Sequence, residues 1–223
     1  MREIILDTET TGLDPEAGHR IVEIAGLEVI DGVTTGKMFQ SYVNPERDMP
    51  DEAYRIHGLS QGFLEKHPRF AVIVDEFLDF ITGATLVIHN AEFDMRFINA
   101  ELARLRKGPI GMESVVDTVE LARRRFPGAQ ASLDALCRRF GIDNSARTTH
   151  GARLDAELLA EVYLELTGGR QAGLGLDSAG AKAPPADAQP VSARAPRPHA
   201  PTDEELEAHA ELVKGLKKPI WTE

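Results

Sequence analysis

The pattern of apolar and polar residues along positions 1–167 predicts strands first, and then strands that alternate with helices. Apolar or alternating runs bounded by glycine and proline predict strands, and apolar residues three or four positions apart predict helices. The expected strands are 2–7, 21–30, 37–43, 85–89 and 115–117. The expected helices lie near 51–57, 70–82, 92–106, 117–125, 131–140 and 150–167, and the expected C-terminal cap is Gly168. This order is typical of an α/β fold in which helices flank a mixed β-sheet.

The composition changes at the end of this first segment. Residues 177–201 contain eight alanines and six prolines but no Phe, Tyr or Trp. Such a stretch buries too little apolar surface to offset the entropy that is lost on ordering it. We therefore expect a folded domain at 1–169, a flexible linker at 170–201 and a separate C-terminal segment at 202–223.

The C-terminal segment has the pattern of a short amphipathic helix. Thr202, followed three residues later by Glu205, fits a capping box, which marks a helix start. A lone helix of about 16 residues is marginal in water, so we expect this one to fold on a partner, with Trp221 as an anchor. The expected helix runs from Asp203 to Lys218. Its apolar stripe consists of Leu206, Ala210, Val213 and Leu216.

Charge and cysteine content narrow the class of protein. Residues 168–201 carry +2 and residues 202–223 carry −3, so residues 1–167 carry −10 of the formal net charge of −11. This acidity argues against binding nucleic acid by charge alone. The single cysteine, Cys137, excludes an intrachain disulfide. The apolar run Ile4–Leu6 is too short for a signal peptide, and no run of 18 apolar residues occurs, so we expect a cytosolic protein without a membrane segment.

Acidic residues follow the expected buried strands or begin the expected helices. Asp7 and Glu9 follow the first apolar strand, and residues two apart on an extended chain point to the same side. Asp94 lies one turn inside a helix that follows another strand, where an acid would also complement the helix dipole. His150 precedes the last helix of the domain, and Asp155 lies about one turn inside it.

Together, these four carboxylates and one histidine predict a metal site. The crevice beyond the carboxyl ends of strands is where ligands bind in open α/β sheets. The sequence has no thiolate cluster and no histidine pair at metal spacing, which disfavours zinc, whereas hard oxygen ligands favour Mg²⁺ or Mn²⁺. Clustered carboxylates would repel a phosphodiester unless cations stood between them. A two-metal site would resolve that conflict.

The same residues resemble the motifs of a known family. Asp7-Thr8-Glu9, Asp94, and His150 with Asp155 five residues later are similar to the ordered motifs of the DEDDh exonucleases. These enzymes form the DnaQ-like branch of the ribonuclease-H-like fold. The resemblance covers 1–169 and is closest in LDTETTG, VIHNAEFD, SLDALCRRFGIDNS and RTTHGARLDAELLAEVYLELTGG. It implies a ribonuclease-H-like mixed sheet and a metal-dependent 3′–5′ exonuclease that proofreads for a bacterial replicative DNA polymerase.

The resemblance implies a role for each residue of the expected site. Asp7, Glu9 and Asp155 would ligate two divalent ions, Mg²⁺ or Mn²⁺, and contact the substrate. Asp94 would complete the coordination shell, directly or through water. His150 would take a proton from the attacking water, a task that suits an imidazole near neutral pH. The product would be a nucleoside 5′-monophosphate.

Four further residues are candidates for contact with the terminal nucleotide. Glu52 and His57, in DEAYRIHGLS, match the family segment with that role, although His57 also fits a loop histidine. Phe63 and Leu13 are candidates for stacking or wedging at the terminal base, although core packing explains them more simply. A mismatch makes fraying of a 3′ end cheaper by a few kcal/mol, which would give selectivity without reading sequence.

The resemblance also implies partners. The segment 202–223 resembles the family segment that binds the α subunit of the polymerase. Residues 171–176 resemble a sliding-clamp-binding peptide, but Leu176 stands where such peptides end in an aromatic residue, so binding should be weak. A Gly-rich linker is the alternative interpretation of these residues. A small accessory subunit on the nuclease domain is a further candidate partner, and the cytoplasmic replisome at the nucleoid is the expected location.

Two other functions fit parts of the sequence. Related DEDDh ribonucleases trim RNA 3′ ends with the same chemistry, but they typically lack a long linker and a terminal helix. A non-catalytic connector between polymerase and clamp would have a degenerate site, whereas all five site residues are present here. We therefore expect an exonuclease that acts on frayed, single-stranded DNA 3′ ends.

Overall fold

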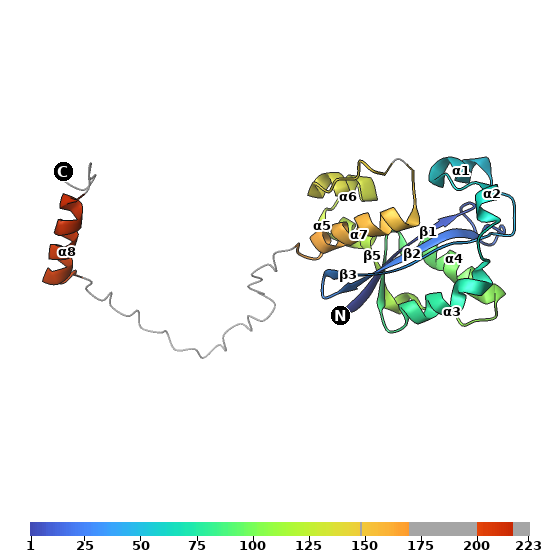
Figure 1. Ribbon diagram of the computed structural model, residues 1–223, viewed down its shortest axis with the longest axis horizontal. Coiled ribbons are helices and arrows are strands. Elements are labelled where there is room, and N and C mark those ends of the chain that lie inside the picture. Colours follow the sequence, from blue (N-terminus) through green and yellow to red (C-terminus); the bar gives the residue numbers. More distant parts are fainter. Residues whose placement is uncertain (148, 170–199, 216–223) are drawn as a thin grey trace, which may run out of the picture. The chain divides into compact units, whose positions relative to one another are not determined.

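A five-stranded mixed β-sheet forms the centre of the domain in this computed structural model, which describes residues 1–147, 149–169 and 200–215 (Figure 1). The strands lie in the order β3-β2-β1-β4-β5. Their bounds are Arg2–Thr10 for β1, Ile21–Ile30 for β2, Val33–Tyr42 for β3, Thr85–Ile88 for β4 and Val115–Asp117 for β5. Neighbours among β1, β2 and β3 pair antiparallel, whereas β4 pairs parallel with β1 and with β5. The mixed α/β sheet predicted from the sequence is confirmed.

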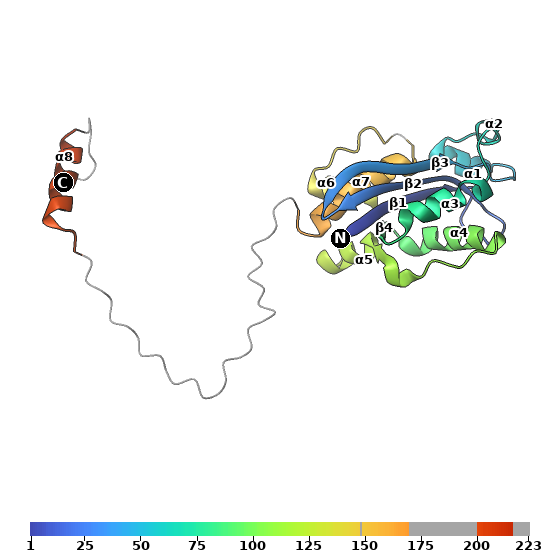
Figure 2. The same cartoon turned by 60° about the horizontal axis from the view of Figure 1, so that its bottom comes forward.

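Helices cover both faces of this sheet (Figure 2). Their bounds are α1 Asp51–His57, α2 Gln61–Leu64, α3 Phe70–Ile81, α4 Ala91–Arg104, α5 Thr118–Arg125, α6 Leu133–Phe140 and α7 Ala152–Leu166, with a 3₁₀ turn at Met112–Ser114. Ile4 and Leu6 of β1 pack with α3 and α4, whereas Ile5 between them packs with α5, α6 and α7. Successive side chains of a strand point to opposite faces, so one apolar strand contributes to both cores.

β1 is longer than the sequence predicts. The predicted strand 2–7 continues to Thr10, because β1 pairs with β2 as far as Glu9, opposite Glu23, and beyond. Glu9 therefore lies on the strand itself, as Asp7 does, and not after its end. Because the last residues of β1 are polar, the hydrophobic pattern does not reveal that the strand continues there.

β3 also begins earlier than the predicted strand 37–43. A two-residue turn at Asp31-Gly32, with φ of 50° and 78°, joins β2 to β3 and lets Ile30 pair with Val33 at once. Positive φ at both central residues is the signature of the tight turns that connect antiparallel strands. The first five residues of β3 are exposed at the edge of the sheet, so they show no apolar pattern.

The remaining differences concern short elements and one cap. Neither the four-residue α2 nor the three-residue 3₁₀ turn is long enough to show a periodic pattern. α7 ends at Leu166 with Thr167 as its C-terminal cap, and not with Gly168 as predicted. Gly168 follows the cap with a φ of 134°, a conformation that glycine adopts without strain.

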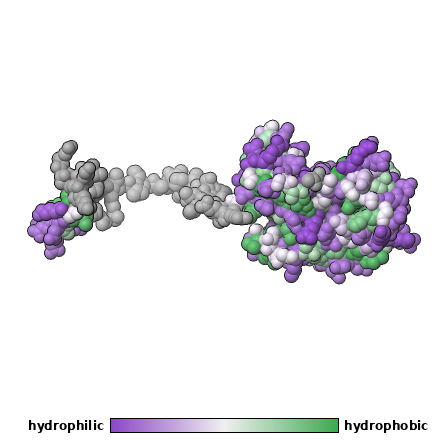
Figure 3. Space-filling model, turned by 45° about the horizontal axis from the view of Figure 1, so that its top comes forward, coloured by the Kyte–Doolittle hydropathy of each residue, from purple (hydrophilic) through white to green (hydrophobic). Residues whose placement is uncertain are grey.

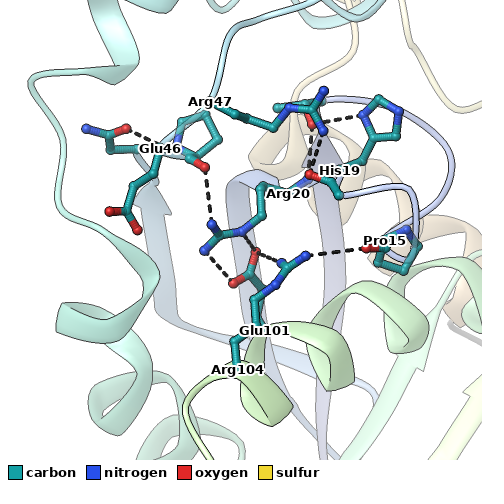
Figure 4. A network of polar contacts seen from close by, with 11 residues as sticks. Pro15, His19, Arg20, Glu46, Arg47, Glu101 and Arg104 are labelled. Atoms are coloured by element: carbon teal, nitrogen blue, oxygen red, sulfur yellow. Dashed lines mark hydrogen bonds and ion pairs between the residues drawn. The ribbon is translucent and has the colours of Figure 1, made fainter.

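Arginine side chains fix the loop between β1 and β2 to α4 (Figure 4). The Thr11 amide donates to the Arg20 carbonyl at 2.9 Å and closes the neck of this loop. Arg20 also donates to both carboxylate oxygens of Glu101, at 2.6 and 2.8 Å, and Glu101 is only 2% exposed. Arg104 donates to the same carboxylate at 3.1 Å and to the Pro15 carbonyl at 3.3 Å. The loop is thereby held at its neck and near its middle.

The C-terminal unit is a separate helix, α8, which spans Asp203–Lys214. The predicted capping box is present, because the Thr202 hydroxyl accepts from the Glu205 amide at 3.3 Å and the Glu205 carboxylate accepts from the Thr202 amide at 2.8 Å. The helix ends four residues before Lys218, the predicted end.

Several sequence predictions fall outside the described residues. They are the linker with the clamp-like peptide 171–176, the last part of the C-terminal stripe at Leu216, and the anchor Trp221. Among the helices of residues 1–147, 149–169 and 200–215, none is long and apolar enough to cross a bilayer.

Candidate active site

β1 supplies the first two acidic side chains of the site. Because Asp7 and Glu9 are two positions apart on a strand, both point to the same side. Glu9 is 8% exposed and Asp7 is partly exposed. In the neighbouring strand, Glu23 lies opposite Glu9 and is itself buried, so a further carboxylate borders the pair.

A sharp turn brings Asp94 to the same strand. Asn90, between β4 and α4, has a left-handed φ of 65°, which asparagine tolerates better than most residues. Asp94 follows in the first turn of α4 and is buried. Its Oδ1 accepts from the Thr8 amide at 3.0 Å and from the Thr8 hydroxyl at 2.7 Å. Thr8 thus fixes Asp94 beside the two acids of β1.

A buried glutamate attaches the start of α7 to the sheet. The Glu23 carboxylate accepts from the Ala152 amide at 3.1 Å, and Asp155 lies one turn further along the helix with 4% of its surface exposed. Just before the helix, the His150 amide donates to the Ile56 carbonyl of α1 at 3.0 Å. These contacts leave the imidazole of His150 half exposed beside a buried carboxylate.

The predicted site residues come together from β1, α4 and the start of α7. Glu9, His150 and Asp155 each offer a ligand atom, and these atoms lie within 4.8 Å of one another. His150 Nδ1 is 3.3 Å from Asp155 Oδ2. Asp7 feels the charges of Asp94, Glu9 and Asp155, so all four predicted carboxylates belong to one cluster.

Desolvation and mutual repulsion raise the pKa values of these acids. Desolvation is the largest cause: it raises the pKa of Glu9 to about 8, that of Asp94 to about 7, and that of Asp7 well above its usual range. Neighbouring carboxylates raise the pKa of Asp7 and Glu9 further, whereas the hydrogen bonds from Thr8 lower that of Asp94. Because a nearby cation favours the ionised form, this set of carboxylate oxygens fits a divalent ion that prefers hard ligands.

Arg147, in the loop between α6 and α7, also contacts the cluster. Its Nε and Nη2 donate to the two oxygens of Asp155 at 2.5 and 2.6 Å. Its Nη1 donates to Asp134 at 2.8 Å, and Nη2 lies 2.8 Å from His150 Nδ1. The hydrogen bonds to Asp155 raise the pKa of Arg147, so the guanidinium remains charged.

A pocket of about 460 Å³ opens beside the acids, and its lining includes Glu9, Leu13, Glu52 and His57. His57 is the last residue of α1 and not a loop residue, and it is 5% exposed. Its Nδ1 accepts from the Leu59 amide at 3.0 Å, so Nε2 carries the proton of the neutral ring. Within the described residues, Nε2 has no hydrogen-bond partner.

The two apolar candidates for base contact differ in position. Leu13 is 78% exposed and lines this pocket, so core packing does not explain it. Phe63 does not line the pocket. It packs against Tyr42 and His67, with ring centroids 5.0 and 4.5 Å apart, and its position gives no support to a stacking role.

Three residues of the site carry little sequence signal of their own. Thr8 and Glu23 support acids or helices that are distant in sequence, and no local pattern reveals such a pairing. Arg147 precedes His150 by three residues in a loop. Charge balance could have pointed to Arg147, because buried acids require a cation or a hydrogen-bond donor close by.

Comparison with known proteins agrees with this geometry. Residues 4–163 match the family model RNase_T, an exonuclease. The DNA polymerase III subunit epsilon of Rickettsia felis is 49% identical over 98% of this chain and 98% of its own length. The same subunit of Escherichia coli K12 is 48% identical over 76% of this chain and 72% of its own length.

Solved structures give the same result. Exonuclease X, in complex with 5′ overhanging duplex DNA, has a TM-score of 0.56 and 27% identity over 74% of this chain and 90% of its own. The nuclease domain of 3′hExo, a DEDDh family member bound to rAMP, shares the fold with a TM-score of 0.65 and 19% identity, over 74% and 91% of the two chains. This chain therefore belongs to the exonuclease family and, within it, to the family of DNA polymerase III epsilon subunits.

Proposed function

We propose that this protein is the proofreading 3′–5′ exonuclease subunit of a bacterial DNA polymerase III. It removes mismatched 3′-terminal nucleotides as nucleoside 5′-monophosphates. The observation that carries the proposal is the convergence of Asp7, Glu9, Asp94, His150 and Asp155 on one cluster. The names of its relatives support DNA as substrate and association with polymerase III.

Asp7, Glu9 and Asp155 would hold two divalent ions, Mg²⁺ or Mn²⁺, with Asp94 as a further ligand, directly or through water. The raised pKa values of three of these acids support this assignment, because they mark ionised forms that require a cation. When bound, the ions supply positive charge that lets a phosphodiester approach carboxylates and that stabilises the transition state. Members of this family depend on divalent metal.

His150 is the proposed general base. Its ring is half exposed, so water can reach it, and its Nδ1 is 3.3 Å from Asp155 Oδ2. When Nδ1 donates to that carboxylate, Nε2 is free to accept a proton from the attacking water. The hydrogen bond from the His150 amide to the Ile56 carbonyl fixes the backbone that carries the ring.

The pocket beside the acids would hold the terminal nucleotide. Glu52 and His57 line it together with Glu9, and the unpartnered Nε2–H of His57 offers a buried donor. Leu13 stands exposed at the same pocket, where it could separate the terminal base from its neighbour. A single unstacked nucleotide fits such a site, and mismatched ends unstack at lower cost.

The domain's charge of −10 favours delivery of the DNA end by a partner over independent capture. Hydrophilic residues predominate on the domain face in Figure 3, and apolar residues form small separate areas. The α subunit of the polymerase is the proposed partner of α8, where Leu206 and Leu212 are 50% and 66% exposed. The clamp contact at 171–176, a small accessory subunit and a cytoplasmic replisome remain parts of the same proposal.

RNA-end trimming is the second candidate, because the fold is shared with 3′hExo. The epsilon relatives that span 98% of the chain, including its C-terminal segment, favour DNA. A non-catalytic connector is disfavoured, because every residue that the chemistry requires is present.

With Mg²⁺ and a 3′-mismatched DNA primer, the wild-type protein should release nucleoside monophosphate, and should do so faster than from a paired primer. Asp7→Asn with Glu9→Gln should abolish release, because the variant removes two ligands while keeping the side-chain volumes. Chromatography of the products measures both rates, and circular dichroism verifies folding. An RNA primer of the same sequence is the control for substrate class. Excision by the folded double variant at the wild-type rate would contradict the two-metal proposal.

The thermal stability of the protein in EDTA should fall as the pH rises from about 5 to 8. In the folded state Glu9 keeps its proton up to a pKa of about 8, whereas an ordinary glutamate releases it near 4.5. Ionisation therefore favours the unfolded chain across this interval, and stability is recovered as the pH falls. Calorimetric melting measures the slope, which should be smaller in the Asp7→Asn, Glu9→Gln variant. A wild-type melting temperature that does not depend on pH would show that burial does not raise the pKa values of these acids in the folded protein.

His150→Ala should reduce the rate of excision by about 10² to 10⁴ at neutral pH, because no other group takes up the proton. Its affinity for Mn²⁺, measured by calorimetry, should remain close to that of the wild type. His209→Ala, at an exposed position of α8, is the matched control and should change neither quantity. A large loss of Mn²⁺ affinity in His150→Ala would make His150 a ligand instead of a base.

Truncation after Gly169 should abolish binding to the polymerase α subunit and preserve excision of single-stranded ends. Tethering by a linker raises the effective concentration to about millimolar, so proofreading should suffer far more than free hydrolysis. Leu206→Asp with Val213→Asp should reproduce the loss, because both residues lie in the apolar stripe. Ala208→Asp, on the other side of α8, adds a charge outside the stripe and should still bind. Full binding by the truncated protein in a pull-down would place the contact on the nuclease domain.

A further inference from the structure

Arg147 directs its polar contacts into the acidic cluster. Although it belongs to a loop, its side chain is only 9% exposed. Nε and Nη2 hold both oxygens of Asp155, Nη1 holds Asp134, and Nη2 also lies against His150 Nδ1. An arginine side chain in a surface loop is usually far more exposed to solvent than this. The guanidinium therefore occupies part of the site that the proposed chemistry requires.

The first consequence concerns Asp155. A fork-to-fork pair at 2.5 and 2.6 Å engages both carboxylate oxygens. A divalent ion coordinated by the same carboxylate would lie at about 2.1 Å from an oxygen, and so within a few ångströms of the guanidinium. Like charges at such a distance repel strongly in a poorly solvated site. Coordination by Asp155 and the present position of Arg147 therefore compete with each other.

The second consequence concerns His150. A guanidinium has donors only, so the 2.8 Å contact makes Nδ1 an acceptor and places the ring proton on Nε2. A neutral ring in that tautomer has no free electron pair at Nε2 with which to accept a proton. If Arg147 moves away, Nδ1–H can donate to Asp155 Oδ2, which already lies 3.3 Å from Nδ1. The same movement would thus release the metal ligand and the base.

A second anchor is present for the displaced side chain. Asp134, in the first turn of α6, already accepts from Arg147 Nη1 at 2.8 Å. Its side chain is 49% exposed, so it can hold the guanidinium nearer to solvent. Asn144 donates to the same Oδ1 at 2.9 Å and keeps that carboxylate in place.

We propose that Arg147 is an internal cation that competes with the divalent metal for Asp155, and that metal binding transfers Arg147 to Asp134 and frees His150 to act as the base. This inference rests on the proposed metal role of Asp155. It makes Arg147 a positioning residue whose two positions correspond to a resting and an active arrangement of the site.

Calorimetric titration with Mn²⁺ tests the competition. Arg147→Gln should bind Mn²⁺ about tenfold more tightly than the wild type or better, since an opposite charge in contact shifts carboxylate equilibria by that order. In EDTA the same variant should melt at a lower temperature, because the carboxylates lose their internal cation. Arg147→Lys keeps the charge but not the bidentate contact with Asp155. Its Mn²⁺ affinity should therefore lie between those of the wild type and Arg147→Gln.

The matched control is Arg153→Gln. Arg153 lies in the first turn of α7, and its substitution removes the same charge. Its side chain pairs with Glu157, and the two side chains are 58% and 41% exposed. It should change Mn²⁺ affinity by less than about twofold, as expected for an exposed charge screened by solvent. An equal gain in Mn²⁺ affinity in both variants would mean that only the long-range charge matters, and it would overturn the proposed competition.

The ring tautomer of His150 gives a readout independent of affinity and activity. In EDTA, ¹⁵N chemical shifts of the wild type should place the proton on Nε2, and Mg²⁺ should move it to Nδ1. Arg147→Gln should have the Nδ1–H form already in EDTA. A wild-type ring that keeps Nε2–H with Mg²⁺ bound would overturn the proposed release of the base.

The outcomes separate this inference from the function on which it rests. If Asp155→Asn binds Mn²⁺ as well as the wild type, Asp155 is not a ligand and the proposed metal site is wrong. If Asp155→Asn loses binding while Arg147→Gln also weakens it, the metal site stands but Arg147 orients Asp155 instead of competing for it. Tighter binding by Arg147→Gln, with no gain in Arg153→Gln, supports the competition.

Discussion

The proximity of several carboxylates in a poorly solvated place is the constraint on which the rest of this structure depends. Each ionised acid raises the cost of ionising the next, so the cluster needs donors and cations from elsewhere. Thr8 of β1 donates to Asp94 of α4, and Arg147 of a loop donates to Asp155 of α7. In both cases the support comes from an element other than the one that carries the acid. The site therefore exists only when these elements are assembled.

β1 combines two tasks along its length. Its first half, Ile4–Leu6, contributes to the cores on both faces of the sheet, and its second half carries Asp7, Thr8 and Glu9. Parallel pairing with β4 holds one side of the strand as far as Leu6, and antiparallel pairing with β2 holds the other side past Glu9. The paired part of the strand is thus continuous with the end that carries the acids, which limits how far the acids can move apart under their own repulsion.

Most of the fold, and the proximity of the five candidate site residues, were predictable, because each rests on a local pattern. Apolar periodicity reveals the long helices and buried strands, and the spacing of Asp7 and Glu9 follows from strand geometry. The extension of β1 and the contacts of Arg147 and Glu23 were not predictable in this way. They depend on pairing with residues distant in sequence, and polar side chains at strand ends give no hydrophobic signal. For Phe63, the sequence left stacking on a base and plain packing open, and only the structure shows its contacts with Tyr42 and His67.

The hydrogen bond from the His150 amide to the Ile56 carbonyl joins two parts of the site that have different tasks. Ile56 belongs to α1, which carries Glu52 and His57 at the pocket beside the acids, whereas His150 belongs to the loop that leads into α7. A tilt of α1 would act on the backbone at His150 through this contact. Under the proposed function, a change in α1 would therefore affect both the pocket for the terminal nucleotide and the position of the base.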